Sequence, residues 1–96
     1  RKQYLVDFGT RVRYYREKLG ITQKELGVRA GYANGTNPAA TISKIEKGQM
    51  DISQTKTAEL AAALGVEPYH LIVSPQVSRL LKYAELIQKG DDNVDI

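Results

Sequence analysis

Apolar residues recur along this chain at steps of three and four positions, in short segments that are each closed by a glycine. The first segment spans roughly residues 4–19 and is followed by Gly20; its apolar residues are Leu5, Phe8, Val12, Tyr15 and Leu19. This spacing places them on one face of an amphipathic helix, whereas no stretch shows the alternation of a strand. The pattern predicts an all-α fold of five or six helices.

The second and third helical segments flank a run of turn-forming residues. Thr22 and Glu25 have the spacing of a capping box, which predicts a helix that carries Leu26 inward and ends at Gly31. Residues 32–37, YANGTN, have turn chemistry. Proline is favoured at the first position of a helix, so the next helix is expected at Pro38. We expect it to bury Ile42 and Ile45 and to stop at Gly48.

Two more segments complete the predicted core. Ser53 is the expected cap of a fourth helix, closed by Gly65. Its apolar residues are Ala58, Leu60, Ala61 and Leu64. Residues 68–73 are predicted to form one short helical turn that brings Leu71 and Ile72 into the core.

A last amphipathic helix is expected over residues 74–90, opening at Ser74-Pro75 and ending at Gly90. Its apolar stripe consists of Val77, Leu80, Leu81, Ala84 and Ile87. The stripe can pack inward or meet a partner. The sequence thus divides into a domain over residues 1–73, an additional C-terminal helix, and an acidic tail over residues 91–96.

Composition and charge narrow the classes of function. The 96 residues contain no cysteine and one histidine, which leaves no thiolate site and no His/Cys cluster, and we expect neither a metal nor another cofactor. No apolar run is long enough to cross a bilayer, so a cytoplasmic protein without membrane contact is expected. The net charge of +3 divides into +6 over residues 1–56 and −3 over residues 57–96. This asymmetry favours a polyanion partner for the N-terminal part.

Several spaced motifs carry a family resemblance. They are Arg16, residues 20–26 (GITQKEL), residues 30–31 (AG), residues 41–48 (TISKIEKG) and residues 60–66 (LAAALGV). In these motifs the sequence resembles the Cro/cI-like (XRE) helix-turn-helix regulators, over roughly residues 8–73. The resemblance implies a lambda-repressor-like fold. It also implies a sequence-specific regulator of double-stranded DNA that places the second helix of its helix-turn-helix motif in the major groove.

The same resemblance implies roles for individual residues. Arg16 and Glu46 occupy the positions of a buried ion pair in the family, although the residues alone also allow two surface charges. Phosphate contacts fall on Thr22, Gln23, Thr41, Lys47, Arg13 and Lys24. Gln23 could equally be an exposed early-helix residue, and Arg13 and Lys24 could be plain surface.

The base-reading positions implied by the resemblance are Ala39, Ala40, Ser43 and Lys44. The alanines offer only methyl contact to thymine, so direct readout from this helix is expected to be sparse. Gly31 and Ile42 lie eleven positions apart, about five more than the resemblance leads us to expect. The extra residues fall in the turn at 32–37. Either Asn34, Thr36 and Asn37 contact bases, or the insertion is a solvent loop.

Two partner classes stay open for the last helix. In the first, the protein is a repressor whose C-terminal helix forms a homodimer on a palindromic operator, with recognition helices about 34 Å apart. In the second, it is an antitoxin-type DNA-binding protein whose last helix holds a protein partner. An enzyme is not expected, because His70 adjoins a core leucine and has no cysteine or paired carboxylates to work with. Tyr14, Tyr15 and Tyr83 fall on helices, where packing is their usual role.

Overall fold

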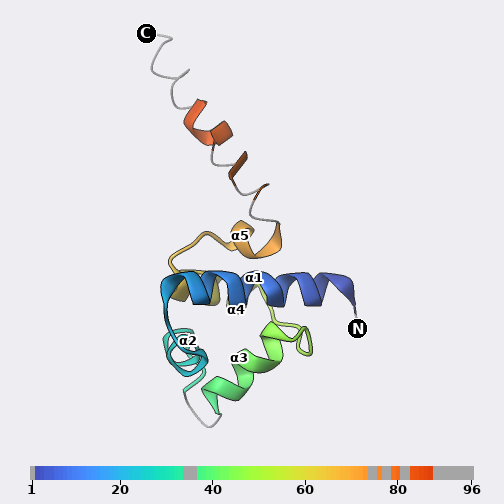
Figure 1. Cartoon of the computed structure of the whole chain (residues 1–96), viewed down its shortest axis with the longest axis vertical. Coiled ribbons are helices and arrows are strands. Elements are labelled where there is room, and N and C mark those ends of the chain that lie inside the picture. The colour runs from blue at the N-terminus through green and yellow to red at the C-terminus, as the bar shows by residue number, and fades with distance from the viewer. Residues whose placement is uncertain (1, 34–36, 74–75, 77–78, 81–82, 88–96) are drawn as a thin grey trace.

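The computed structural model describes residues 2–33, 37–73, 76, 79–80 and 83–87, and every regular element among them is helical. Five helices are α1 (Gln3–Leu19), α2 (Gln23–Arg29), α3 (Pro38–Glu46), α4 (Gln54–Leu64) and α5 (Pro68–Ile72). Residues 76, 79–80 and 83–87 are helical as well and belong to the additional C-terminal helix. The predicted all-α, lambda-repressor-like class is confirmed (Figure 1).

Local signals in the sequence set most of the helix ends. The Thr22 hydroxyl accepts a hydrogen bond from the Glu25 amide at 3.0 Å, and the Glu25 carboxylate accepts one from the Thr22 amide at 3.2 Å. Ser53 caps α4 in the same way, through the Lys56 amide. Gly20 ends α1 with φ of 76°, in the left-handed region that glycine enters without steric cost. The predicted starts of α2, α3 and α4 are therefore correct.

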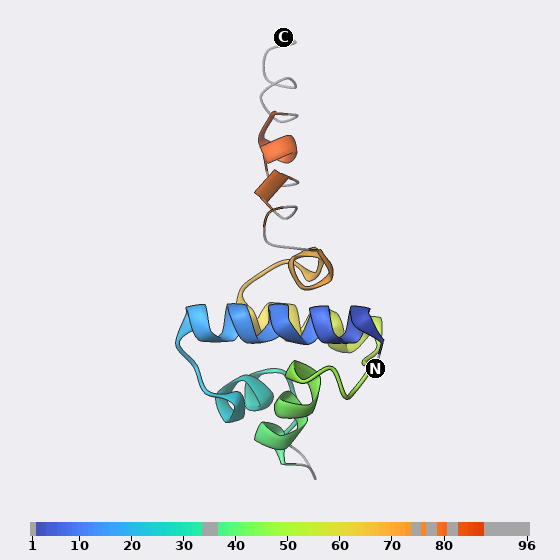
Figure 2. The same cartoon turned by 45° about the vertical axis from the view of Figure 1, so that its right-hand side comes forward.

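One hydrophobic core joins the five helices. Figures 1 and 2 show α1 crossing the middle of the molecule, with α2 and α3 on one side, α5 on the other, and α4 behind α1. The core consists of Val12, Tyr15, Ile21, Leu26, Ala30, Ile42, Ile45, Leu60, Ala61, Leu64 and Leu71. Every helix contributes to it, so α3 is fixed against the other helices by its inner face and leaves its outer face open.

Two glycines inside helices let backbones approach closely. A Cβ on Gly27 of α2 would lie 2.6 Å from the Pro38 Cβ at the start of α3. A Cβ on Gly9 of α1 would lie 2.6 Å from the Glu46 carbonyl oxygen at the end of α3. The start of α3 thus packs against Gly27 of α2 and its end against Gly9 of α1, at positions where a larger residue would clash. A glycine in a helix interior costs stability, which is the sequence signal that could have revealed both contacts.

One predicted core position, Ile72, is wrong, and two apolar positions of the predicted helices, Leu19 and Ala58, are exposed. Leu19 is 47% exposed because it is the last residue of α1, beyond Tyr15, the last α1 residue buried in the core. Ile72 is 61% exposed; α5 is only five residues long, and its inward position is already occupied by Leu71. Ala58 is exposed near the start of α4, while Leu60, Ala61 and Leu64 are buried as expected.

Candidate nucleic-acid interface

Arg16 of α1 and Glu46 of α3 form an ion pair. The Arg16 Nε lies 2.6 Å from Glu46 Oε2, and Nη2 donates to Oε1 at 3.2 Å. The side chains are only 14% and 5% exposed. Arg16 also donates from Nη1 to the Ile21 carbonyl at 2.9 Å, just before α2 begins. This hydrogen bonding to Glu46 raises the pKa of Arg16 and connects the end of α3 to α1 and to the turn before α2.

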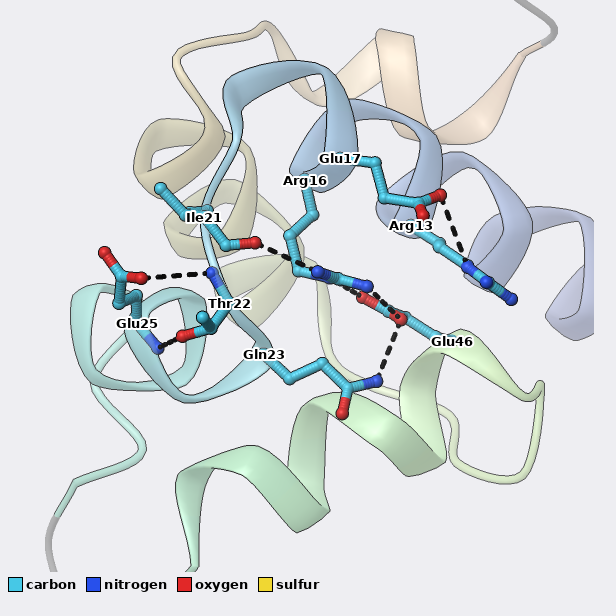
Figure 3. Close-up of polar contacts among 8 residues, drawn as sticks. All are labelled: Arg13, Arg16, Glu17, Ile21, Thr22, Gln23, Glu25 and Glu46. Atoms are coloured by element: carbon cyan, nitrogen blue, oxygen red, sulfur yellow. Dashed lines mark hydrogen bonds and ion pairs between the residues drawn. The ribbon is translucent and has the colours of Figure 1, made fainter.

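Gln23 joins this pair from the first turn of α2. Its Nε2 donates to Glu46 Oε1 at 3.0 Å, so one carboxylate receives side chains from two other helices (Figure 3). The amide oxygen of Gln23 takes no part in that bond, and Nε2 carries a second hydrogen. The sequence placed Gln23 beside a phosphate but did not reveal that Glu46 would orient it. Only the fold brings these positions, 23 residues apart, together.

A small recess opens beside this network. It is lined by Arg13, Arg16, Gln23, Ser43, Glu46 and Lys47. Arg13, Gln23 and Lys47 are three of the predicted phosphate contacts, and here they lie around one hollow. Glu46 neutralises Arg16 inside the recess. Arg13 forms an ion pair with Glu17 at 3.3 Å, and both of those side chains are well exposed. The recess therefore offers cationic and amide donors to an anion of phosphate size.

The outer face of α3 presents the predicted base-reading residues. Ala40 and Lys44 are exposed, while Ala39 and Ser43 are half-buried. Ile42 and Ile45, on the opposite face, are fully buried. Lys44 thus provides a long hydrogen-bond donor on the outer face of α3. The small side chains of Ala39 and Ala40 leave room for a partner surface to approach this face closely. Sparse direct readout from this helix stays a prediction.

Three of the predicted contact residues also serve the ends of α2 and α3. Asn37 caps α3, since its Oδ1 accepts from the Ala40 amide at 3.2 Å. Thr41 donates from its hydroxyl to the Asn37 carbonyl, and Thr22 belongs to the capping box of α2. Lys24 is exposed on α2. Asn34 and Thr36 lie outside the described residues.

The start of the inserted turn is fixed to α4. The Lys56 ammonium lies 4.6 Å from the centre of the Tyr32 ring, 3.5 Å from the Ala30 carbonyl and 3.0 Å from Glu59. Burial raises the pKa of Tyr32. Together with the Asn37 cap, this contact holds both ends of the insertion against the body of the domain.

His70 has a structural contact in α5. Its Nδ1 accepts from the Glu67 amide at 3.0 Å, and its ring stacks on Tyr69 with centroids 4.4 Å apart. Within the described ranges, no three His, Cys, Asp or Glu side chains come together as a possible metal site. None of the described helices has the length and apolarity that a membrane span needs.

Comparison with known proteins agrees with this geometry. The family model of the helix-turn-helix (HTH_3) matches residues 12–71, which include the Arg16–Glu46 pair, the recess and all of α2 and α3. The chain belongs to the XRE-type helix-turn-helix family. This helix-turn-helix protein is a DNA-binding transcriptional regulator, and its family points away from enzymes.

A solved structure supports the assignment of this chain to the helix-turn-helix family. The restriction-modification controller protein C.AhdI from Aeromonas hydrophila is 33% identical, with a TM-score of 0.62 over 70% of this chain and 94% of that chain. No match was found among curated protein sequences. The family match ends at residue 71, so the C-terminal helix lies beyond it.

Proposed function

We propose that this regulator is a repressor that binds a palindromic operator as a homodimer. The observation that carries the proposal is the recess in which Arg13, Gln23 and Lys47 surround the Arg16–Glu46 pair. A phosphate held there would fix the N-terminal half of the molecule on the DNA backbone, because phosphate contacts set register and orientation. The exposed side of α3, with Lys44, would then enter the adjacent major groove.

A homodimer follows from the same scheme. One recognition helix with two alanines, one serine and one lysine at its reading positions supplies few base contacts, and two half-sites compensate for this. The exposed apolar residues Leu80, Ala84 and Ile87 of the C-terminal helix support dimerisation through that helix. Val77 and Leu81, the other two residues of the predicted stripe, lie outside the described residues. The similar C.AhdI protein is a restriction-modification controller, which favours a regulatory role for this chain too.

Selection of bound sites from random duplex DNA tests the proposal. The expected result is an inverted repeat whose half-sites are separated by one helical turn or a multiple of it. A single asymmetric site bound by a monomer would contradict the homodimer. Recovery of no preferred sequence would contradict operator recognition altogether. For the antitoxin alternative, the expected finding is instead that the C-terminal helix binds a toxin encoded next to this gene.

A further inference from the structure

An open groove of about 480 Å³ runs between α1, the loop after α3, and the starts of α4 and α5. Its apolar lining includes Leu5, Phe8, Met50, Ile52 and Ile72, and Asp7 and Asp51 contribute carboxylates. None of the residues predicted to contact DNA lines it. A molecule bound in this groove would leave the recess and the outer face of α3 free.

Exposed apolar side chains gather at the C-terminal end of the described chain. Leu80 and Tyr83 are 67% and 64% exposed, and Ile87 is 47% exposed. With Ala84 they occupy positions i, i+3, i+4 and i+7, which form one stripe along a helix. A contiguous apolar stripe in water marks a surface that is covered in the functional assembly.

The stripe faces away from its own domain. Glu85 lines a hollow together with Tyr69 and His70 of α5, which places the Glu85 side of the helix toward the domain. At 3.6 residues per turn, Leu80, Tyr83 and Ile87 lie on the opposite side from Glu85. Figures 1 and 2 both show the C-terminal helical residues standing away from the body of the molecule.

A hydrogen bond holds the end of α5 to α1. Arg11 Nη1 of α1 donates to the Ile72 carbonyl at 2.9 Å, and Val73 continues with an extended backbone. The end of α5 is thus held at the margin of the groove that Ile72 lines. In this structure the groove is open and the stripe of the same chain is uncovered, and the last helix of a second copy placed in the groove would bury both.

We propose that two copies of this chain exchange their last helices, so that the stripe of each lies in the α1–α4–α5 groove of the other. The stripe would cover Leu5, Phe8 and Ile72. Arg79, beside the stripe on the helical wheel, would face Asp7 and Asp51 at the groove. The exchange is reciprocal, as the closed two-fold symmetry of a dimer requires. This inference rests on the homodimer proposed above and specifies which surfaces form it.

Cross-linking between single-cysteine variants tests the exchange. Because the chain contains no cysteine, Ala58→Cys in the groove and Ala84→Cys on the stripe each introduce a unique thiol. The two variants carry different tags, are mixed as full-length protein, and are treated with a flexible bismaleimide. The expected product is a heterodimer that joins Ala58→Cys to Ala84→Cys. In the matched control, Thr55→Cys, on α4 but outside the groove lining, replaces Ala58→Cys and should give little product.

The outcomes separate this inference from the proposed function. A cross-link between two copies of the Ala84→Cys variant, without the heterodimer of Ala58→Cys and Ala84→Cys, would show a homodimer in which the last helices pair with each other. This result would overturn the exchange alone. A monomer in sedimentation at high concentration, with no cross-link, would overturn both. A cross-link that forms only within a doubly substituted single chain would show that the helix folds onto its own groove, and would also overturn the exchange.

A charge introduced into the groove gives a second measurement. Ala58→Arg should weaken dimerisation about tenfold or more, because the guanidinium would be desolvated beneath an apolar stripe. Thr55→Arg adds the same charge to the same helix and should leave the dimer dissociation constant within about twofold. Circular dichroism shows that both variants are folded before sedimentation is compared. Equal dimerisation of Ala58→Arg and Thr55→Arg would overturn the proposal.

Discussion

The Arg16 guanidinium and the Glu46 carboxylate lie 2.6 Å apart and are almost completely removed from solvent. Glu46 follows directly after the buried Ile45 of α3, and Arg16 follows directly after the buried Tyr15 of α1. The pair therefore sets the position of α3 relative to α1. Because Gln23 donates to the same carboxylate, the orientation of a predicted phosphate contact depends on this pair.

Glu46→Gln should destabilise the protein. A neutral amide leaves the buried Arg16 charge without compensation, so the free energy of unfolding in urea should fall by about 3–5 kcal/mol. Glu17→Gln, which breaks only the exposed pair with Arg13, should change it by about 0.5 kcal/mol or less. Equal losses in the two variants would contradict a stabilising role for the buried pair. The double variant Arg16→Met with Glu46→Leu should regain stability but not DNA affinity, because Gln23 would lose its partner.

Replacing two lysines of the interface should have different effects. Lys47→Ala should weaken binding to all duplex sequences alike and reduce the slope of log K against log salt by about 0.9, as expected for one lost phosphate contact. Lys44→Ala should relax the preference at one base pair, at a cost of about 1–3 kcal/mol for that base. Lys18→Ala, which does not line the recess, is the control. Binding isotherms at several salt concentrations provide both readouts, and an unchanged salt slope in Lys47→Ala would argue against the phosphate role.

Variants of Asn37 separate its cap from base readout. Asn37→Ala removes the acceptor for the Ala40 amide and should lower the free energy of unfolding by about 1 kcal/mol. Asn37→Ser retains a capping oxygen and should be stable to within about 0.5 kcal/mol. If Asn37 only caps α3, the serine variant keeps the operator preference. A changed preference in Asn37→Ser would assign a base contact to the Asn37 amide.

Gly27→Ala should force α2 and α3 apart. The new Cβ would meet Pro38 at 2.6 Å, and such overpacking costs about 1–3 kcal/mol. Gly20→Ala is the matched control, because a Cβ there meets nothing within 4 Å and only the positive φ is strained. Both variants should lose stability, but only Gly27→Ala should lose DNA affinity when both are fully folded. Equal affinities would mean that the spacing of α2 and α3 does not determine binding.

The stability of the fold should decline at alkaline pH through Tyr32. Burial raises the pKa of Tyr32 above its ordinary value of 10.0, while Lys56 opposes the shift, so the folded state favours the neutral phenol. This contribution is complete below pH 10.0 and is lost as the pH rises toward the folded-state pKa. The free energy of unfolding in urea, measured below pH 10.0 and above the folded-state pKa of Tyr32, should therefore decline less for Tyr32→Phe than for the unchanged chain. Identical declines would exclude Tyr32 as a contributor.

The sequence by itself determined the features that depend on neighbouring residues. The capping box at Thr22, the proline at the start of α3, the Ser53 cap and the terminating Gly20 all act within one helical turn, so their spacing in the chain was sufficient. The periodic positions of Ile42 and Ile45 likewise indicated which face of α3 would be buried. These local signals were enough for the fold class and for the position of the helix-turn-helix.

The tertiary structure decided what depends on contacts between distant segments. Periodicity could not show that Leu19 and Ile72 would be exposed, because burial at a helix end depends on which other element covers it. Asn37 was expected either at the bases or in a solvent loop, although its capping bond to the Ala40 amide is local and an Asn directly before Pro38 could have indicated it. Gln23 obtained its partner, Glu46, only when α2 and α3 packed together, since no pattern in one sequence encodes which side chains meet across a core.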